Sequence, residues 1–175
     1  CSINNPTLTE ADLRNLAVAK QYKVTDVMLP FVRNKADLII LREALREYGC
    51  EDIRIFAKIE NMTGVEHLEE LIPYCDYIVI ARGDLGNAMP LSQLPRIQAH
   101  IARVCRKHNK DFMIVTQMLD SMIKNPYPTR AEVNDIYHAV TQGASALMLT
   151  GETAHGKYPV EAMKMLVDTA EESIL

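Results

Sequence analysis

The sequence has no tryptophan, three phenylalanines and seven glycines among 175 residues, and it lacks a long uninterrupted apolar stretch. Its apolar runs, such as Ile78–Ala81, are only a few residues long, whereas a membrane-spanning helix needs about 20 residues. The first residues also lack the basic and apolar regions of a signal peptide. We therefore expect no membrane partner.

A strong charge of one sign is also missing. The 19 Lys and Arg residues stand against 23 Asp and Glu residues, which leaves a net charge of -4. Nucleic acids are bound through clustered basic residues, so we expect no nucleic-acid partner. Hydrophobic residues make up 48% of the chain, which is enough to bury one core. We expect a single domain over residues 1–175.

Cysteine is sparse and unpatterned. The four cysteines are Cys1, Cys50, Cys75 and Cys105, and no two are spaced as C-x-x-C. This spacing provides no zinc or redox motif, and the count is far below that of a disulfide-rich secreted scaffold. We expect reduced thiols in a cytoplasmic protein. Because residue 1 is Cys and not Met, we also expect the sequence to be a segment of a longer protein.

Short apolar runs alternate with amphipathic stretches along the chain. Continuously apolar runs are typical of strands that are buried on both faces of a parallel sheet. We predict five such strands, at residues 27–31, 53–57, 77–81, 112–115 and 146–149.

Capping residues and prolines predict a helix before the first strand and one after each strand. The predicted starts are Thr9, Asn34, Thr63, Pro95, Thr129 and Pro159, and Gly143 is the predicted stop of the fifth helix. Strictly alternating strands and helices indicate an α/β fold with a parallel sheet. A complete (β/α)₈ barrel needs about 250 residues. The pattern leaves open whether the five strands form an incomplete barrel or a small open sheet.

Ligands bind at the carboxyl ends of the strands in parallel α/β folds. Lys58 and Glu60 follow the second run, and a spacing of two residues directs both side chains to one face of a strand. They form either an ion pair that plugs the sheet or part of a site for a charged ligand. Asp84, in the turn Gly83–Gly86 after the third run, supplies a second carboxylate. Two carboxylates and open positions suit Mg²⁺, and a nearby Lys suits a phosphate or enolate oxygen.

Other strand ends are less informative. Thr116 follows the fourth run, where a threonine is usually structural, and Thr150–Thr153 has the composition of a tight turn. The five histidines show no metal-ligand spacing. The residues alone therefore indicate an α/β segment, a divalent metal and an anionic, oxygen-rich small substrate.

Five motifs together resemble the signatures of the pyruvate kinases, in that family's order. They are Ala57–Asn61 (AKIEN), Ala81–Gly86 (ARGDLG), Thr116–Leu119 (TQML), Pro128–Glu132 (PTRAE) and Gly151–Ala154 (GETA). The resemblance extends from about Leu8 to the last helix. Pro30 departs from it, because the family usually has Ser before the Phe.

The resemblance implies strands four to eight of a (β/α)₈ catalytic barrel, an incomplete barrel without the family's lid and C-terminal regulatory domains. It implies phosphoryl transfer from phosphoenolpyruvate to ADP, giving pyruvate and ATP. By similarity, Lys58 is catalytic and binds substrate, and Glu60 and Asp84 hold Mg²⁺ or Mn²⁺. Gly83, Asp84 and Thr116 bind phosphoenolpyruvate or pyruvate.

The same resemblance implies a K⁺ site that lies mostly outside this chain, and a homo-oligomer for the full protein. Because the first three strands are missing, we expect negligible kinase activity from this chain alone and exposed sheet edges that favour self-association. Two alternatives remain open. One is a metal-dependent aldolase or lyase acting on pyruvate or oxaloacetate, and the other is a non-catalytic module that binds anions or another subunit.

Overall fold

The structure, a computed structural model, describes residues 6–174. These residues form one sheet of five parallel strands in the order β1-β2-β3-β4-β5, so each strand pairs with the next one along the chain. The strands are β1 Asp26–Leu29, β2 Arg54–Ile59, β3 Tyr77–Ala81, β4 Asp111–Val115 and β5 Ala146–Met148. The alternating α/β fold predicted from the apolar runs is confirmed, and it brings all five carboxyl ends to one edge.

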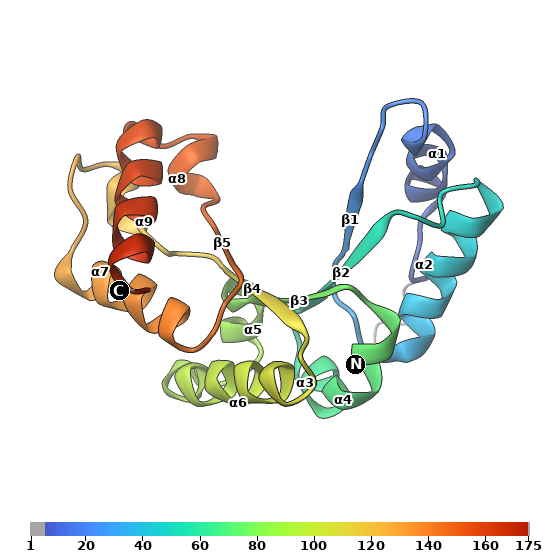
Figure 1. The fold of residues 1–175 in the computed structure, drawn as a ribbon, viewed down its shortest axis with the longest axis horizontal. Coiled ribbons are helices and arrows are strands. Elements are labelled where there is room, and N and C mark those ends of the chain that lie inside the picture. Colours follow the sequence, from blue (N-terminus) through green and yellow to red (C-terminus); the bar gives the residue numbers. More distant parts are fainter. Residues whose placement is uncertain (1–5, 175) are drawn as a thin grey trace.

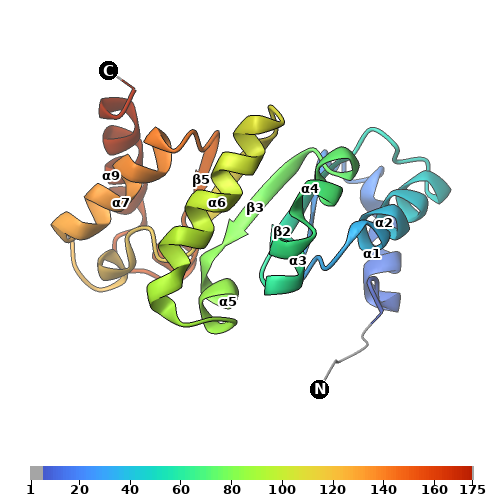
Figure 2. The same ribbon diagram turned by 90° about the horizontal axis from the view of Figure 1, so that it is seen from below.

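Helices follow the strands and pack on one face of the sheet, which curves into an open arc (Figures 1 and 2). The helices are α1 Glu10–Ala19, α2 Lys35–Glu47, α3 Met62–Glu66, α4 Leu68–Leu71, α5 Arg82–Asn87, α6 Leu94–Lys107, α7 Arg130–Thr141, α8 Gly151–Ala154 and α9 Pro159–Glu172. Three 3-10 turns join them, at η1 Ile72–Tyr74, η2 Leu91–Gln93 and η3 Asp120–Ile123. None of the helices in residues 6–174 has the length and apolarity to cross a membrane.

Most of the predicted helix starts are confirmed. Thr9 and Thr129 form capping boxes with Asp12 and Glu132, which satisfies backbone N–H groups that have no partner inside the helix. The Asn34 side chain caps α2, and Pro95 and Pro159 lie in the first turns of α6 and α9. The predicted stop at Gly143 is also correct. The fifth predicted helix is α7, which ends at Thr141, and Gly143 follows it with a left-handed φ of +93° that does not continue a helix.

Several local predictions are wrong. β2 begins at Arg54 and ends at Ile59 instead of spanning residues 53–57. The third helix begins after Asn61, whose side chain accepts a hydrogen bond from the Gly64 N–H, so Thr63 lies inside it. β1 ends at Leu29 instead of residue 31, because Phe31 has a left-handed φ of +51°. The predicted turns at Gly83–Gly86 and Thr150–Thr153 are instead parts of the short helices α5 and α8.

Strand alternation separates the two faces of the sheet. In β2, Ile55, Ala57 and Ile59 pack in the main core under the helices. Alternate residues of a strand point to opposite faces, so Arg54, Phe56 and Lys58 lie on the concave face. Here a smaller cluster packs, formed by Phe56, Val79, Ala81 and Val115, with Tyr77, Met113 and Met148 against it.

The sheet does not close on itself within residues 6–174. β1 and β5 each pair on one side only, and Met28 on β1 is 41% exposed. The apolar pattern left two possibilities, an incomplete barrel and a small open sheet. The curved parallel sheet, which does not close over the described residues, confirms the incomplete barrel (Figure 1).

Candidate active site

Lys58 and Glu60 lie at the carboxyl end of β2, where they form an ion pair, one of the two arrangements that the sequence left open. Lys58 Nζ is 2.8 Å from Glu60 Oε1, and the two side chains are 25% and 2% exposed. A buried carboxylate is costly unless a positive charge and hydrogen bonds compensate it. Here the Lys58 ammonium compensates the charge and still reaches solvent.

The loop after β1 supplies the second partner of Glu60. The Phe31 N–H donates to Glu60 Oε2 over 2.7 Å, and the left-handed backbone at Phe31 (φ +51°) lies beside this contact. The Val32 N–H donates to the Lys58 carbonyl over 3.3 Å, and the Asn61 side chain donates to the Val32 carbonyl over 3.3 Å. Because Pro30 has no N–H, this carboxylate contact depends on the next residue, Phe31.

Gly83 and Asp84 lie in the first turn of α5, directly after β3. Asp84 is exposed. A Cβ atom added to Gly83 would lie 3.0 Å from Thr116 Cγ2, so glycine permits the close approach of α5 to the end of β4. The structure thus brings two of the predicted substrate-binding residues, Gly83 and Thr116, into direct proximity.

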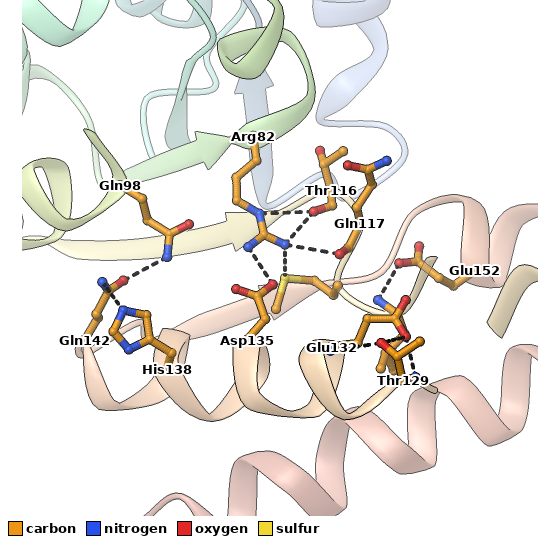
Figure 3. A network of polar contacts seen from close by, with 12 residues as sticks. Arg82, Gln98, Thr116, Gln117, Thr129, Glu132, Asp135, His138, Gln142 and Glu152 are labelled. Atoms are coloured by element: carbon orange, nitrogen blue, oxygen red, sulfur yellow. Dashed lines mark hydrogen bonds and ion pairs between the residues drawn. The ribbon is translucent and has the colours of Figure 1, made fainter. Parts of the chain in front are cut away.

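The backbone at Thr116 and Gln117 is strained. Their φ angles are +83° and +54°, a region that residues with a Cβ seldom adopt. Arg82 holds this turn, since Nε and Nη2 donate to the Thr116 carbonyl over 3.1 and 2.7 Å. Arg82 Nη1 in turn forms an ion pair of 2.6 Å with Asp135 from α7 (Figure 3).

Two further carboxylates brace the same region. Glu152, 1% exposed, accepts hydrogen bonds from the Leu119 and Thr150 N–H groups over 3.0 and 2.8 Å. Glu132 accepts from the Ser121 N–H over 2.7 Å and from the Ser121 hydroxyl over 2.6 Å. The loop after β4 is therefore connected to α8 and to α7.

These contacts change the acidity of both carboxyls. Burial raises the pKa of Glu152, but hydrogen bonds from the Leu119 and Thr150 backbone outweigh it, so this pKa lies below its usual value. Burial acts in the same direction on the pKa of Glu132, and the Ser121 and Thr129 hydrogen bonds lower it below its usual value. Both groups favour the charged form that accepts these hydrogen bonds.

The donor set suits a hard divalent cation. Glu60 and Asp84 provide carboxylate oxygens at the ends of the neighbouring strands β2 and β3. Residues 6–174 contain no group of three or more His, Cys, Asp or Glu side chains that would hold a metal without other ligands. Mg²⁺ is typically bound by one or two carboxylates, and water and substrate oxygens complete its coordination. Glu60 and Asp84 fit that chemistry.

The residues that support the site, Arg82, Asp135 and Glu152, could not be identified from the sequence. Arg82 follows β3 in the sequence, but its partner Asp135 lies 53 positions away, and no local pattern links them. Glu152 belongs to a motif that was assigned to a turn, and its burial depends on packing against the Leu119 loop. For Arg82, the sequence signal was its position as a charged residue directly after the buried strand β3.

A curved parallel sheet with outer helices, and with polar side chains gathered at the carboxyl ends of its strands, defines a segment of a β/α-barrel enzyme. Comparison with known proteins agrees. A family model described as "Pyruvate kinase, barrel domain" matches residues 1–163. The chain belongs to the pyruvate kinase family.

Curated relatives named pyruvate kinase match almost the entire chain. The protein from Clostridium acetobutylicum is 41% identical over 172 residues, which cover 98% of this chain and 36% of that protein. The protein from Bacillus licheniformis is 40% identical over 172 residues, covering 98% of this chain and 29% of that protein. The protein from Thermotoga maritima is 41% identical over 167 residues, covering 95% and 36%. The chain thus spans about a third of the length of these relatives.

Proposed function

We propose that this chain carries the metal and phosphoryl-transfer residues of a pyruvate kinase, which transfers a phosphoryl group from phosphoenolpyruvate to ADP and yields pyruvate and ATP. The observation that carries the proposal is the Lys58–Glu60 pair of 2.8 Å at the carboxyl end of β2. A purely structural ion pair would need neither a second carboxylate nor a strained threonine at the ends of the neighbouring strands, whereas a site for a charged ligand would use both. Here Asp84 and Thr116 follow β3 and β4.

Each residue has a role that its chemistry supports. The Lys58 ammonium neutralises charge on the transferring phosphoryl group and on the enolate oxygen from which it departs. Glu60 and Asp84 hold Mg²⁺ or Mn²⁺, which when bound supplies further charge neutralisation at the same oxygens. Gly83, Asp84 and the Thr116 hydroxyl line the phosphoenolpyruvate and pyruvate pocket.

Family membership and this set of residues favour a kinase over the lyase and the binding-module alternatives. The proposal includes K⁺ and ADP as ligands. The residues that bind them lie mostly outside the segment of the relatives that this chain matches. It also includes a glycolytic, cytoplasmic role, which the free thiols of the described Cys50, Cys75 and Cys105 support.

Calorimetry of Mn²⁺ binding, with and without oxalate as an enolpyruvate mimic, tests the proposal on this chain. We expect oxalate to tighten Mn²⁺ binding, and we expect Glu60→Gln to weaken it by about 2 kcal/mol or more, since a charged ligand is lost. Glu66→Gln, which removes an exposed carboxylate on α3, is the matched control and should bind as the parent does.

Equal Mn²⁺ binding by the parent and Glu60→Gln would contradict the metal assignment. A coupled assay with phosphoenolpyruvate and ADP should detect negligible turnover from the 175-residue chain. Turnover typical of the family from this chain would show that the open sheet is already a complete catalytic unit, against our expectation.

A further inference from the structure

We propose that Arg82 is a positioning residue, which holds Thr116 and Gln117 in their left-handed conformation so that Thr116 faces Gly83. This role rests on the proposed function, because Thr116 matters only if the Gly83–Asp84 region binds substrate. Arg82 acts through the backbone of the loop after β4, without contacting the ligand itself.

The conformation that needs support is unusual. Thr116 and Gln117 are consecutive, both have a Cβ atom, and both have positive φ angles (+83° and +54°). Such residues persist only where the surrounding structure over-determines them. Gln117 is exposed, so packing of its side chain does not provide this support.

Arg82 supplies the support through its fork of donors. Nε and Nη2 both donate to the Thr116 carbonyl, and Nη2 also donates to the Gln117 carbonyl over 3.3 Å. The contacts therefore fall on the two residues with positive φ. The side chain is 11% exposed, so water competes weakly for these hydrogen bonds.

The remaining nitrogen orients the fork. Arg82 Nη1 is 2.6 Å from Asp135 Oδ2, and this charge-assisted contact, together with the contacts of Nε and Nη2, fixes the guanidinium plane. All three nitrogens of Arg82 therefore have protein acceptors (Figure 3). This occupancy distinguishes Arg82 from an arginine that binds a substrate anion directly.

The loop is held from its other side by Glu152, which accepts the Leu119 N–H over 3.0 Å. The Leu119 amide is therefore an internal probe of loop order that does not depend on any ligand. Release of the Thr116 and Gln117 carbonyls should increase local opening, and amide exchange at Leu119 should become faster.

The test measures two quantities on the 175-residue chain, which are oxalate affinity in the presence of Mn²⁺ and the amide exchange rate of Leu119. We expect Arg82→Gln to weaken oxalate binding by about tenfold or more, since hydrogen bonds of a charged donor are lost. We expect faster Leu119 exchange in the same variant. Arg82→Lys should resemble Arg82→Gln, because a single ammonium cannot replace the fork.

Two variants separate positioning from charge and from general stability. Arg14→Gln removes an exposed arginine whose ion pair with Glu10 is 3.8 Å long, and both readouts should stay unchanged. In a Gln117→Gly background, where glycine adopts positive φ without a Cβ clash, Arg82→Gln should weaken oxalate binding by a clearly smaller factor.

An equal loss of oxalate binding in both backgrounds, or an unchanged Leu119 exchange rate in Arg82→Gln, would overturn the positioning role. Failure of the parent chain to bind oxalate would count against the proposed function alone, because Leu119 exchange still decides whether Arg82 orders the loop. Thermal unfolding of each variant identifies any that fails to fold. In that event Asp135→Asn, which removes charge from the partner of Arg82, is measured instead and is expected to change both readouts in the same direction.

Discussion

At the scale of single residues, Glu60, Lys58 and Arg82 each have a charged protein partner, whereas Asp84 is exposed. Glu60 accepts from Phe31 and pairs with Lys58, and Arg82 pairs with Asp135. Among the described residues, no buried side-chain nitrogen or oxygen lacks a hydrogen-bond partner. Such groups hold their geometry before a ligand arrives, which the proposed phosphoryl transfer would require, because its catalysis depends mainly on positioning and charge neutralisation.

Glu152 leads to a prediction about acid stability. Its pKa in the folded state lies below the value of 4.5 for a free Glu. The stabilisation is therefore fully present above the unfolded pKa and is lost as the pH falls through the folded pKa. We expect Glu152→Gln to lower the free energy of unfolding by about 1–3 kcal/mol at pH 7, with a smaller difference in acid.

Urea denaturation at a series of pH values measures this effect. Glu43→Gln, at an exposed position of α2, is the control and should be neutral at every pH. A Glu152→Gln variant whose deficit stays constant from neutral to acid pH would mean that the carboxylate charge does not stabilise the loop.

At the scale of elements, α6 shows how an amphipathic helix covers the sheet. Its buried residues include Ile97, Ile101 and Val104, and its last turn carries Arg106 and Lys107. The basic residues interact favourably with the carboxyl end of the helix dipole. The apolar stripe was readable from the sequence because residues three and four apart share one face of a helix.

Ile101 is completely buried in this interface. We expect Ile101→Ala to destabilise the chain by about 2–5 kcal/mol through the lost transfer energy and the cavity it leaves. Leu91→Ala, at a position that is 70% exposed, should change stability by less than about 0.5 kcal/mol. Chemical denaturation measures both, and similar losses for the two variants would contradict the packing of α6 on the sheet.

Predictions for the elements were correct at most helix caps, and wrong at the Thr63 cap, at the end of β1 and at two turns that form short helices. The Thr129 box and the Pro159 start depend on contacts within a few residues. The helix α5, in contrast, forms over a glycine-containing segment. Thr116, in the loop after β4, lies against Gly83 on this helix, a contact between distant segments that no local pattern contains.

At the scale of the whole molecule, β1 and β5 each have a pairing strand on one side only within the part of the chain that the structure describes. Open edges favour pairing with another chain. We expect this 175-residue chain to self-associate in a concentration-dependent way, detected by light scattering. Met28 is an exposed residue of the edge strand β1. Met28→Lys should weaken the association by about tenfold, because burial of the lysine charge between two chains costs roughly 1–2 kcal/mol.

A monomer at high concentration would contradict this prediction. A variant with lysine at an exposed position outside the strands, Tyr22→Lys (Tyr22 is 70% exposed), is the control and should associate as the unmutated chain does. Two expectations stay predictions. They are the single domain over residues 1–175 and the homo-oligomeric state of the full protein.

The order of strands and helices, the parallel sheet and the shared face of Lys58 and Glu60 all follow from local sequence. They depend on periodicity, caps and the alternation of side chains along a strand, and each of these acts over a few residues. The contacts of Arg82 with Thr116 and Asp135 and the burial of Glu152 depend on packing between segments 33 or more residues apart. Contacts at such separations exist only once the strands have paired, so their partners could be identified only in the folded chain.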